Sequence, residues 1–198
     1  LGTDGLLGEP VLLSRGINGD VPSKPFGDDS EYAFSPDGAT VYFDVRNLSV
    51  GEPWSTNFDI YSVATDGSSE PTNHTADNLA WDASPLPSRD GKTLYYLAMK
   101  RPGFEADRFA IMALDLASGG TREIAAGWDR SAGALKESGD GKTLYTTTDD
   151  RGQHPLFAID VATGKATQLV GDGQVAGFDV GAKALLIGFT EARSKRSR

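Results

Sequence analysis

The sequence predicts an all-β protein that is built from a repeated antiparallel unit. Three observations lead to this fold class. Gly and Pro together make up 34 of the 198 residues, which indicates many turns and excludes a bundle of long helices. Short segments alternate apolar and polar residues with the period of two that strands have. One motif also recurs at intervals of 53 and 50 residues, a spacing that is typical of repeat folds.

The clearest repeat is a hairpin turn followed by a strand. Asp-Gly pairs stand at 37–38, 90–91 and 140–141, and a Ser lies two residues before each Asp. Asp-Gly supplies the positive-φ positions of a tight turn. Because β-branched and aromatic residues alternate directly after each pair, strands are predicted over 39–43, 92–96 and 142–146.

Two further strands follow in each repeat. Segments 59–63, 109–116 and 155–161 read as strands, and each ends in a Gly-containing turn. A last short strand is predicted over 70–75, 121–125 and 166–170, and Trp-Asp pairs follow the first two of these at 81–82 and 128–129. One unit therefore holds four strands in about 50 residues, which is the content of a propeller blade.

Counting these units predicts a partial β-propeller of about three to four four-stranded antiparallel blades over residues 1–191. Complete blades are expected at about 30–76, 80–126 and 130–171, and an incomplete one at 174–190, with strands over 175–180 and 183–190. A leading strand is expected at Val11–Leu13. Either this strand completes the last blade of a tight four-bladed ring, or the chain is an open arc of a larger propeller. We favour the arc, whose open sheet edges would then self-associate or pair with a missing segment.

The charge excludes some classes of partner. The chain has 28 acidic and 19 basic residues, a formal charge of −9, which argues against nucleic-acid binding. No apolar run approaches the ~18 residues of a membrane span, so no membrane partner is predicted. Residues 192–198 carry four basic residues, without which 15 basic face 28 acidic residues, a balance of −13. We interpret them as a disordered tail, with a docking arm for an acidic partner as the alternative.

Three stretches carry a family resemblance: Asn-Phe-Asp-Ile-Tyr at 57–61, Ala-Trp-Asp-Ala-Ser-Pro at 80–85 and, above all, Met-Lys-Arg-Pro-Gly-Phe-Glu-Ala-Asp-Arg-Phe at 99–109. They resemble the propellers of bacterial dipeptidyl-peptidase and acylaminoacyl-peptidase relatives in the prolyl oligopeptidase family of serine peptidases. The Ser-Pro-Asp-Gly strand starts are also similar to TolB-like propellers. The resemblance covers roughly residues 17–180 and implies an additional α/β-hydrolase domain that carries the catalytic Ser, Asp and His.

No catalytic residue is assigned to the chain itself. It has no Cys and no G-x-S-x-G pentapeptide, and its two histidines, His74 and His154, read as surface or turn residues. No cofactor or metal is predicted, because the short acidic turns at 149–151 and 171–173 lack the ligand spacing that calcium needs. The isolated chain is therefore expected to be inactive, although the parent protein would be a serine peptidase.

The charged loop at 101–108 holds the candidate binding residues. The resemblance implies that the propeller offers charged groups to the end of a peptide substrate. We expect Glu105 and Arg101 to bind that end, the carboxylate pairing with a free α-amino group, and Asp107 and Arg108 to support them structurally. The alternative is a loop braced only by its own ion pairs.

Two functions remain open on the sequence alone. The first is the non-catalytic propeller region of a prolyl-oligopeptidase-like peptidase, which gates the substrate and recognises the peptide end. The second is a stand-alone TolB-like propeller that binds a protein or peptide. A periplasmic or secreted location is implied by the resemblance, and a cytoplasmic one stays open.

Overall fold

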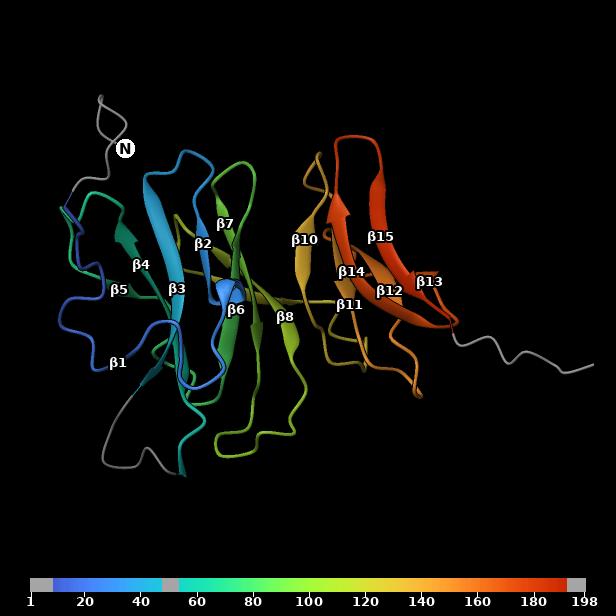
Figure 1. The fold of residues 1–198 in the computed structure, drawn as a ribbon, viewed down its shortest axis with the longest axis horizontal. Coiled ribbons are helices and arrows are strands. Elements are labelled where there is room, and N and C mark those ends of the chain that lie inside the picture. The colour runs from blue at the N-terminus through green and yellow to red at the C-terminus, as the bar shows by residue number, and fades with distance from the viewer. Residues whose placement is uncertain (1–8, 48–53, 192–198) are drawn as a thin grey trace, which may run out of the picture.

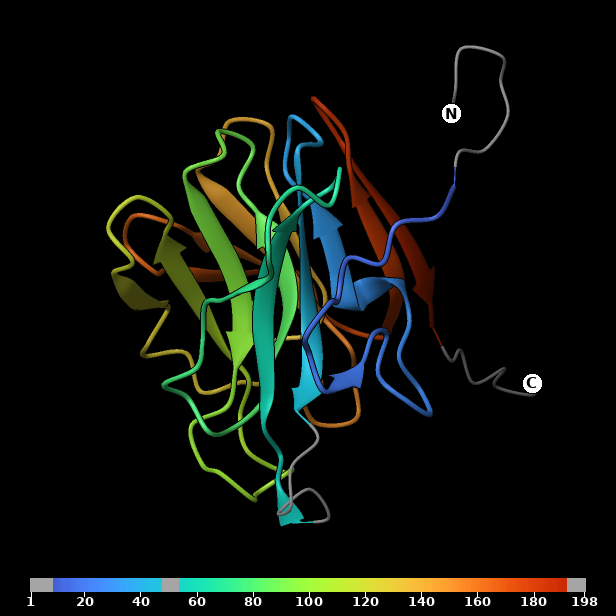
Figure 2. The same cartoon turned by 90° about the vertical axis from the view of Figure 1, so that its left-hand side faces the viewer.

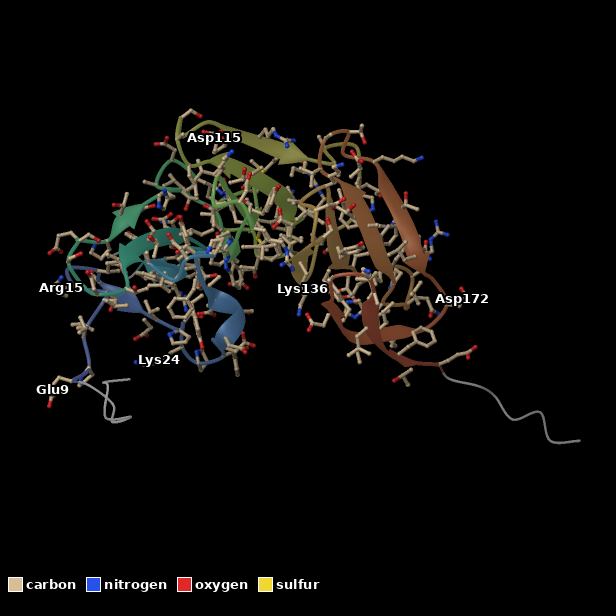
Figure 3. The ribbon with its side chains drawn as sticks, turned by 90° about the horizontal axis from the view of Figure 1, so that it is seen from above. Glu9, Arg15, Lys24, Asp115, Lys136 and Asp172 are labelled. Carbon is tan, nitrogen blue, oxygen red and sulfur yellow. The ribbon has the colours of Figure 1, made fainter. Side chains whose placement is uncertain are left out.

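The computed structural model describes residues 9–47 and 54–191, and it is an all-β arc of four antiparallel sheets (Figure 1). Seen from above, the sheets follow one another around this arc in chain order (Figure 3). We name them blades 1 to 4. The fold is a partial β-propeller, as the repeats predict, and it is not closed into a ring.

Blade 1 is built around one long strand, β3 (Thr40–Asn47). Its remaining elements are β1 (Gly19–Asp20), the short 3-10 helix η1 (Asp29–Glu31), β2 (Tyr32–Phe34), β4 (Phe58–Ala64) and β5 (Thr72–Asn73). Both β1 and β2 pair with β3, at opposite ends of it, while β4 pairs with it along its length. The predicted last strand at 70–75 is reduced to the two residues of β5.

Blades 2 and 3 are four-stranded meanders with the same strand order. Blade 2 consists of β6 (Asp82–Pro87), β7 (Thr93–Ala98), β8 (Ala110–Asp115) and β9 (Thr121–Ile124). Blade 3 consists of β10 (Leu135–Glu137), β11 (Thr143–Thr147), β12 (Leu156–Asp160) and β13 (Ala166–Val170). Blade 4 has only two strands, β14 (Gln174–Val180) and β15 (Leu185–Thr190).

The repeated Ser-x-Asp-Gly motif is a self-contained turn. In blade 1 the Asp37 carboxylate accepts hydrogen bonds from the Ser35 hydroxyl at 2.6 Å and from the Ala39 N–H at 3.0 Å. These two bonds lower the pKa of Asp37, the hydroxyl bond contributing most. Gly38 takes a φ of +71°, which favours glycine. The same bonds recur at Ser88-Asp90 and Ser138-Asp140, so the motif has a local structural reason in blades 1, 2 and 3.

The core lies between the blades. Because successive strand residues point to opposite faces, blades 2 and 3 each pack one face on the blade before and the other on the blade after. The largest cluster joins blades 2 and 3, where Ile111, Ile124, Leu144 and Ile159 are buried. Smaller clusters join blade 1 to blade 2 and blade 3 to blade 4.

The predicted leading strand at Val11–Leu13 is wrong. Residues 11–13 pair with no strand, and Leu13 instead packs with Ile17 and Val21 against a face of blade 1 that holds Phe43. Figure 2 shows this dark-blue segment passing in front of β3. The apolar run thus covers the face of blade 1 that no other blade covers in the structure. It does not complete blade 4, so the four-bladed ring does not form.

The predicted basic tail, residues 192–198, lies outside the described residues. Within the part of the chain that the structure describes, no helix is long and apolar enough to cross a membrane.

Candidate functional site

The charged loop at 99–109 connects β7 to β8 and leans on blade 1. The Gly103 N–H donates to the Thr56 hydroxyl at 2.9 Å, and Thr56 lies just before β4. Gly103 has a φ of +75°, so the turn that brings its N–H to blade 1 requires glycine. The loop is therefore tied across the boundary between blades 1 and 2.

Asp107 is the structural anchor of this loop. One carboxylate oxygen accepts the N–H groups of Lys100 and Arg101, each at 2.9 Å. The other lies 2.9 Å from the Arg101 guanidinium, which also sits 4.0 Å from the centre of the Phe104 ring. The hydrogen bond from Arg101 is the main reason that the pKa of Asp107 lies well below its usual range. Arg101 and Asp107 thus brace the loop itself.

Arg108 is bound to the outer strand of the same blade. Its guanidinium pairs with the Glu123 carboxylate on β9 at 2.5 Å, and the Lys100 ammonium pairs with the same carboxylate at 2.7 Å. Burial acts to raise the pKa of Glu123, but the bonds from Lys100 and Arg108 outweigh it and lower the pKa. Three of the four candidate residues are therefore engaged in supporting contacts.

Glu105 differs from the other three candidates. It is exposed, and among the described residues it makes no hydrogen bond or ion pair. It lines a pocket of about 400 Å³ between blades 1 and 2. The pocket is also lined by Lys24, Glu31, Arg46, Phe58 and Trp81. The loop therefore presents one uncommitted carboxylate to a cavity.

Aromatic rings form part of the wall of this pocket. Phe58 and Trp81 are stacked, with ring centres 4.5 Å apart and planes 17° apart, and the edge of Trp81 meets Phe109. This explains the Asn-Phe-Asp-Ile-Tyr and Trp-Asp motifs structurally, because the first supplies Phe58 and the second Trp81. The rings offer an apolar surface and π faces that attract cations.

Some charged groups of the pocket already make hydrogen bonds or ion pairs within the protein. Glu31 accepts from the Ser23 N–H and hydroxyl, both at 2.6 Å, and the Lys24 ammonium pairs with Asp20 at 2.8 Å. Glu105 is the carboxylate of the pocket that stays available to a ligand. The sequence did not indicate Lys24, Glu31 or Arg46, because they lie far from the loop in sequence. Lys24 follows β1, Glu31 ends η1 and Arg46 is near the end of β3.

Two buried carboxylates lie outside this pocket, at the boundary between blades 1 and 2. Asp44 on β3 accepts from the Ser84 N–H at 3.0 Å, and burial raises the pKa of Asp44 to about 8. Asp82 on β6 accepts from the Asn78 amide at 2.9 Å, and burial raises its pKa to about 7. Both are 1% exposed; Asp44 bonds across to blade 2, and Asp82 lines a separate pocket of about 400 Å³.

Neither histidine forms a catalytic arrangement with the described residues. His74 is half-buried, shares a 2.7 Å hydrogen bond with the Ser62 hydroxyl, and has its pKa lowered by burial. It is thus less exposed than a surface histidine. His154 lies in the β11–β12 connection, where its backbone N–H donates to the Gly173 carbonyl at 2.9 Å.

Comparison with curated proteins gives relatives that are named dipeptidyl-peptidase 5. No family model matches the chain. The chain is 37% identical over 155 residues to "Probable dipeptidyl-peptidase 5" of Emericella nidulans, a match that covers 74% of this chain and 21% of that protein. It is 34% identical over 169 residues to "Dipeptidyl-peptidase 5" of Trichophyton schoenleinii, covering 79% and 23%. The chain thus spans about a fifth of the length of the curated relatives it matches.

Comparison with solved structures shows the fold. Putative TolB from Agrobacterium tumefaciens superposes with a TM-score of 0.64 at 18% identity, over 83% of this chain and 55% of that one. Puromycin hydrolase gives 0.60 at 21% identity, over 81% and 28%. A Mycobacterium tuberculosis puromycin-hydrolyzing peptidase gives 0.56 at 22% identity, over 74% and 24%. The chain is therefore a β-propeller module, similar in fold to TolB and puromycin hydrolase and similar in sequence to part of dipeptidyl-peptidase 5.

Proposed function

We propose that this chain is the non-catalytic propeller region of a serine peptidase of the prolyl oligopeptidase family, and that it binds the amino end of a peptide substrate beside Glu105. One observation carries the proposal. Of the four charged candidates in the loop, Glu105 alone makes no contact within the loop or blade, and it lines a pocket. The relatives named dipeptidyl-peptidase 5 support a peptide as the ligand.

The chemistry of the pocket suits a peptide amino terminus. A carboxylate pairs with an ammonium group through charge-assisted hydrogen bonds, which are stronger than neutral ones. The stacked Phe58 and Trp81 rings provide an apolar wall for the first side chain and a π surface for the cation. The braces on Asp107 and Arg108 hold the loop in place, so that Glu105 is positioned before the ligand arrives.

In this proposal, peptide hydrolysis is catalysed by residues outside this chain. The propeller would limit access to the catalytic residues and orient the end of the peptide. A periplasmic or secreted location, and a place in the bacterial dipeptidyl-peptidase or acylaminoacyl-peptidase branch, are parts of the same proposal and rest on the resemblance of the motifs.

Calorimetry with the dipeptide amide Ala-Phe-NH₂ and its N-acetylated form tests the proposal. We expect the free amine to bind, the acetylated form to bind about tenfold more weakly, and Glu105→Gln to weaken binding of the free amine by a similar factor. Glu70→Gln is the matched control, because Glu70 is exposed and lies outside the pocket. Equal binding of the free amine by wild type and Glu105→Gln would overturn the role of Glu105.

The second candidate function is a TolB-like module that binds a protein or peptide. The observation in its favour is the fold similarity to putative TolB, with a TM-score of 0.64 over 83% of this chain. Such a module has no need of a free amino terminus. Equally tight binding of the free and acetylated peptides would therefore favour this candidate over the first.

A further inference from the structure

The interface between blades 1 and 2 departs from the repeat in its outer half. His74 donates its backbone N–H to the Ile60 carbonyl at 2.8 Å. The strand register makes Ile124, which pairs with Ile111, the counterpart of His74 in blade 2, and Val170 its counterpart in blade 3. Both counterparts are aliphatic and pack in the core. A histidine thus stands in blade 1 where the repeat places an aliphatic side chain.

A second polar residue accompanies this histidine. Ser62 is paired with Tyr42, which packs toward blade 2, and its counterparts in blades 2 and 3 are Ala113 and Ala158. The Ser62 hydroxyl lies 2.7 Å from Nε2 of His74, and the other ring nitrogen, Nδ1, makes no hydrogen bond to the described residues. Two polar side chains therefore replace an apolar pair, and departures of this kind are expected at functional positions.

A cavity of about 400 Å³ lies beside this histidine, between β5 of blade 1 and β7, β8 and β9 of blade 2. Strands flank it on both sides, so the cavity is internal to the arc and does not lie at an end of it. Its wall is apolar at Ala98, Met99 and Met112, and polar at His74, Asp82 and Tyr96. None of its lining residues lines the pocket beside Glu105.

Asp82 brings an unbalanced buried carboxyl group to this cavity. One of its oxygens accepts from the Asn78 amide at 2.9 Å, while Oδ2 is buried and has no hydrogen-bond partner among the described residues. The lysine that lines the cavity, Lys100, pairs instead with Glu123 at 2.7 Å. Buried carboxylates in proteins are normally paired with a positive charge and hydrogen-bonded. The carboxyl group of Asp82 is therefore suited to receive a cation.

Two further groups next to Asp82 can accept hydrogen bonds. Burial, with a smaller contribution from the charge of Asp82, raises the pKa of Tyr96 to about 12, so the phenol lies near this carboxyl group and stays neutral. Burial also lowers the pKa of His74, which keeps the imidazole neutral at pH 7 and able to accept. Within the described ranges, no group of three His, Cys, Asp or Glu residues could hold a metal ion. The chemistry of the cavity therefore favours an organic cation.

We propose that this cavity binds a small alkylamine, whose primary ammonium group pairs with Asp82 and whose alkyl chain packs on Met99 and Met112. An ammonium group has three N–H donors, which match the carboxylate, the Tyr96 hydroxyl and Nδ1 of His74. Charge-assisted hydrogen bonds of this kind are stronger than neutral ones. The flexible methionine side chains adapt to the shape of an alkyl chain.

The methionines give a direct readout of this cavity. Met99 and Met112 are the two methionines of the sequence, and both line it. In NMR spectra of the full chain labelled with carbon-13 at the methionine methyl groups, titration with n-butylamine hydrochloride at pH 8 should shift both signals saturably. 1-Butanol has a similar size but no charge, and it should bind at least about tenfold more weakly. This comparison leaves the protein unaltered, so it does not depend on the folding of a variant.

A lysine side chain carries the same chemistry as a free alkylamine, so Nα-acetyl-lysine amide is the third probe. Weaker binding of this probe than of butylamine supports a small free amine as the ligand. Binding at least as tight as that of butylamine would assign the cavity to a lysine of a polypeptide and would overturn the proposal.

The variant Asp82→Asn locates the ammonium group. Asparagine keeps the size of the side chain and still accepts from Asn78, but it has no charge, so butylamine should bind at least about tenfold more weakly. Asp172→Asn is the matched control, because it removes one negative charge at an exposed position outside the cavity. The proposal is overturned if butylamine gives no saturable shift, if 1-butanol binds equally well, or if Asp82→Asn binds like wild type.

The pH dependence of binding tests the same carboxyl group in the unaltered protein. Burial raises the pKa of Asp82 to about 7, and Asp59 acts in the same direction, while hydrogen bonds from Asn78 and Thr75 act against it. Because the ionised form attracts an ammonium group, the affinity for butylamine should rise about tenfold from pH 6 to pH 8. The other titratable groups that line the cavity are His74, Asp77, Tyr96 and Lys100. They remain in Asp82→Asn, so a pH dependence that persists in this variant would contradict binding through Asp82.

Discussion

Two buried carboxylic acids, Asp44 and Asp82, lie at the boundary between blades 1 and 2. One carboxylate oxygen of Asp44 accepts a hydrogen bond from the Ser84 N–H. The other oxygen, Oδ1, has no hydrogen-bond partner among the described residues. Ser84 itself holds a positive φ of +55°, an unusual conformation for a residue with a side chain. The neutral, protonated form of the Asp44 carboxyl group is favoured in this position, because burial removes the water that would stabilise the charged form.

The stability of the protein should therefore fall as the pH rises from about 5 to 8. Burial raises the pKa of folded Asp44 to about 8, above its ordinary value of 3.8. The folded state thus holds a proton that the unfolded state has lost, and this stabilisation disappears as the pH rises through the folded pKa. Asp82, with a pKa raised to about 7, acts in the same direction, and His74, with a pKa lowered by burial, acts against it.

Thermal unfolding of Asp44→Asn isolates this contribution. Wild type should lose roughly 5 °C of Tm between about pH 5 and pH 8, and Asp44→Asn should lose clearly less. Asp172→Asn, at an exposed position, is the control and should follow wild type. Parallel curves for wild type and Asp44→Asn would show that Asp44 does not titrate in this range.

At the scale of the element, the blades show which features follow from local sequence. The Asp-Gly turns are predictable because each is completed by atoms within six residues, from the Ser hydroxyl to the glycine with positive φ. The strands after these turns are predictable because β-branched and aromatic residues alternate along them, as in a strand whose two faces are both packed. Local sequence does not distinguish a paired strand from an apolar segment that is merely covered, and residues 11–13 are the example.

The turn glycines provide a direct test of this local control. Gly91 has a φ of +69°, and an added Cβ would meet nothing within 4 Å, so the cost of Gly91→Ala is purely conformational. We expect the free energy of unfolding to fall by ~1–2 kcal/mol in a urea titration. Gly139→Ala is the matched control, because Gly139 also has open space around it but no positive φ. A loss of equal size in both variants would contradict this explanation of the motif.

The charged loop shows the limit of prediction at the same scale. Its sequence identifies a charged cluster between two strands but does not say which charges pair with one another. Asp107 and Arg108 become supports only because β7, β8 and β9 bring Lys100 and Glu123 beside them. The pocket also requires the connection between β1 and η1 and the end of β3, so local sequence does not identify Lys24 and Arg46 as pocket residues.

At the scale of the whole molecule, the proposed function assigns recognition to this arc and catalysis to groups outside it. Blades meet through apolar faces, and the binding candidate lies where the blade 2 loop leans on blade 1. The sequence contains no G-x-S-x-G element and no Cys. We therefore expect the purified chain to give no hydrolysis of a dipeptidyl chromogenic substrate above the buffer rate. Activity that survives a second, orthogonal purification would contradict the assignment of catalysis to another domain.

The location of peptide binding on the chain distinguishes the pocket beside Glu105 from the other surfaces of the molecule. NMR of the isotope-labelled chain, titrated with Ala-Phe-NH₂, reports each tryptophan indole N–H separately. We expect the NMR signals of the Trp81 indole N–H and the Gly103 amide to shift on titration. The signal of the Trp128 indole N–H, which packs near Phe157 in blade 3, should stay unchanged. Shifts confined to blades 3 and 4, with Trp81 and Gly103 unmoved, would contradict the claim that the pocket beside Glu105 recognises the peptide.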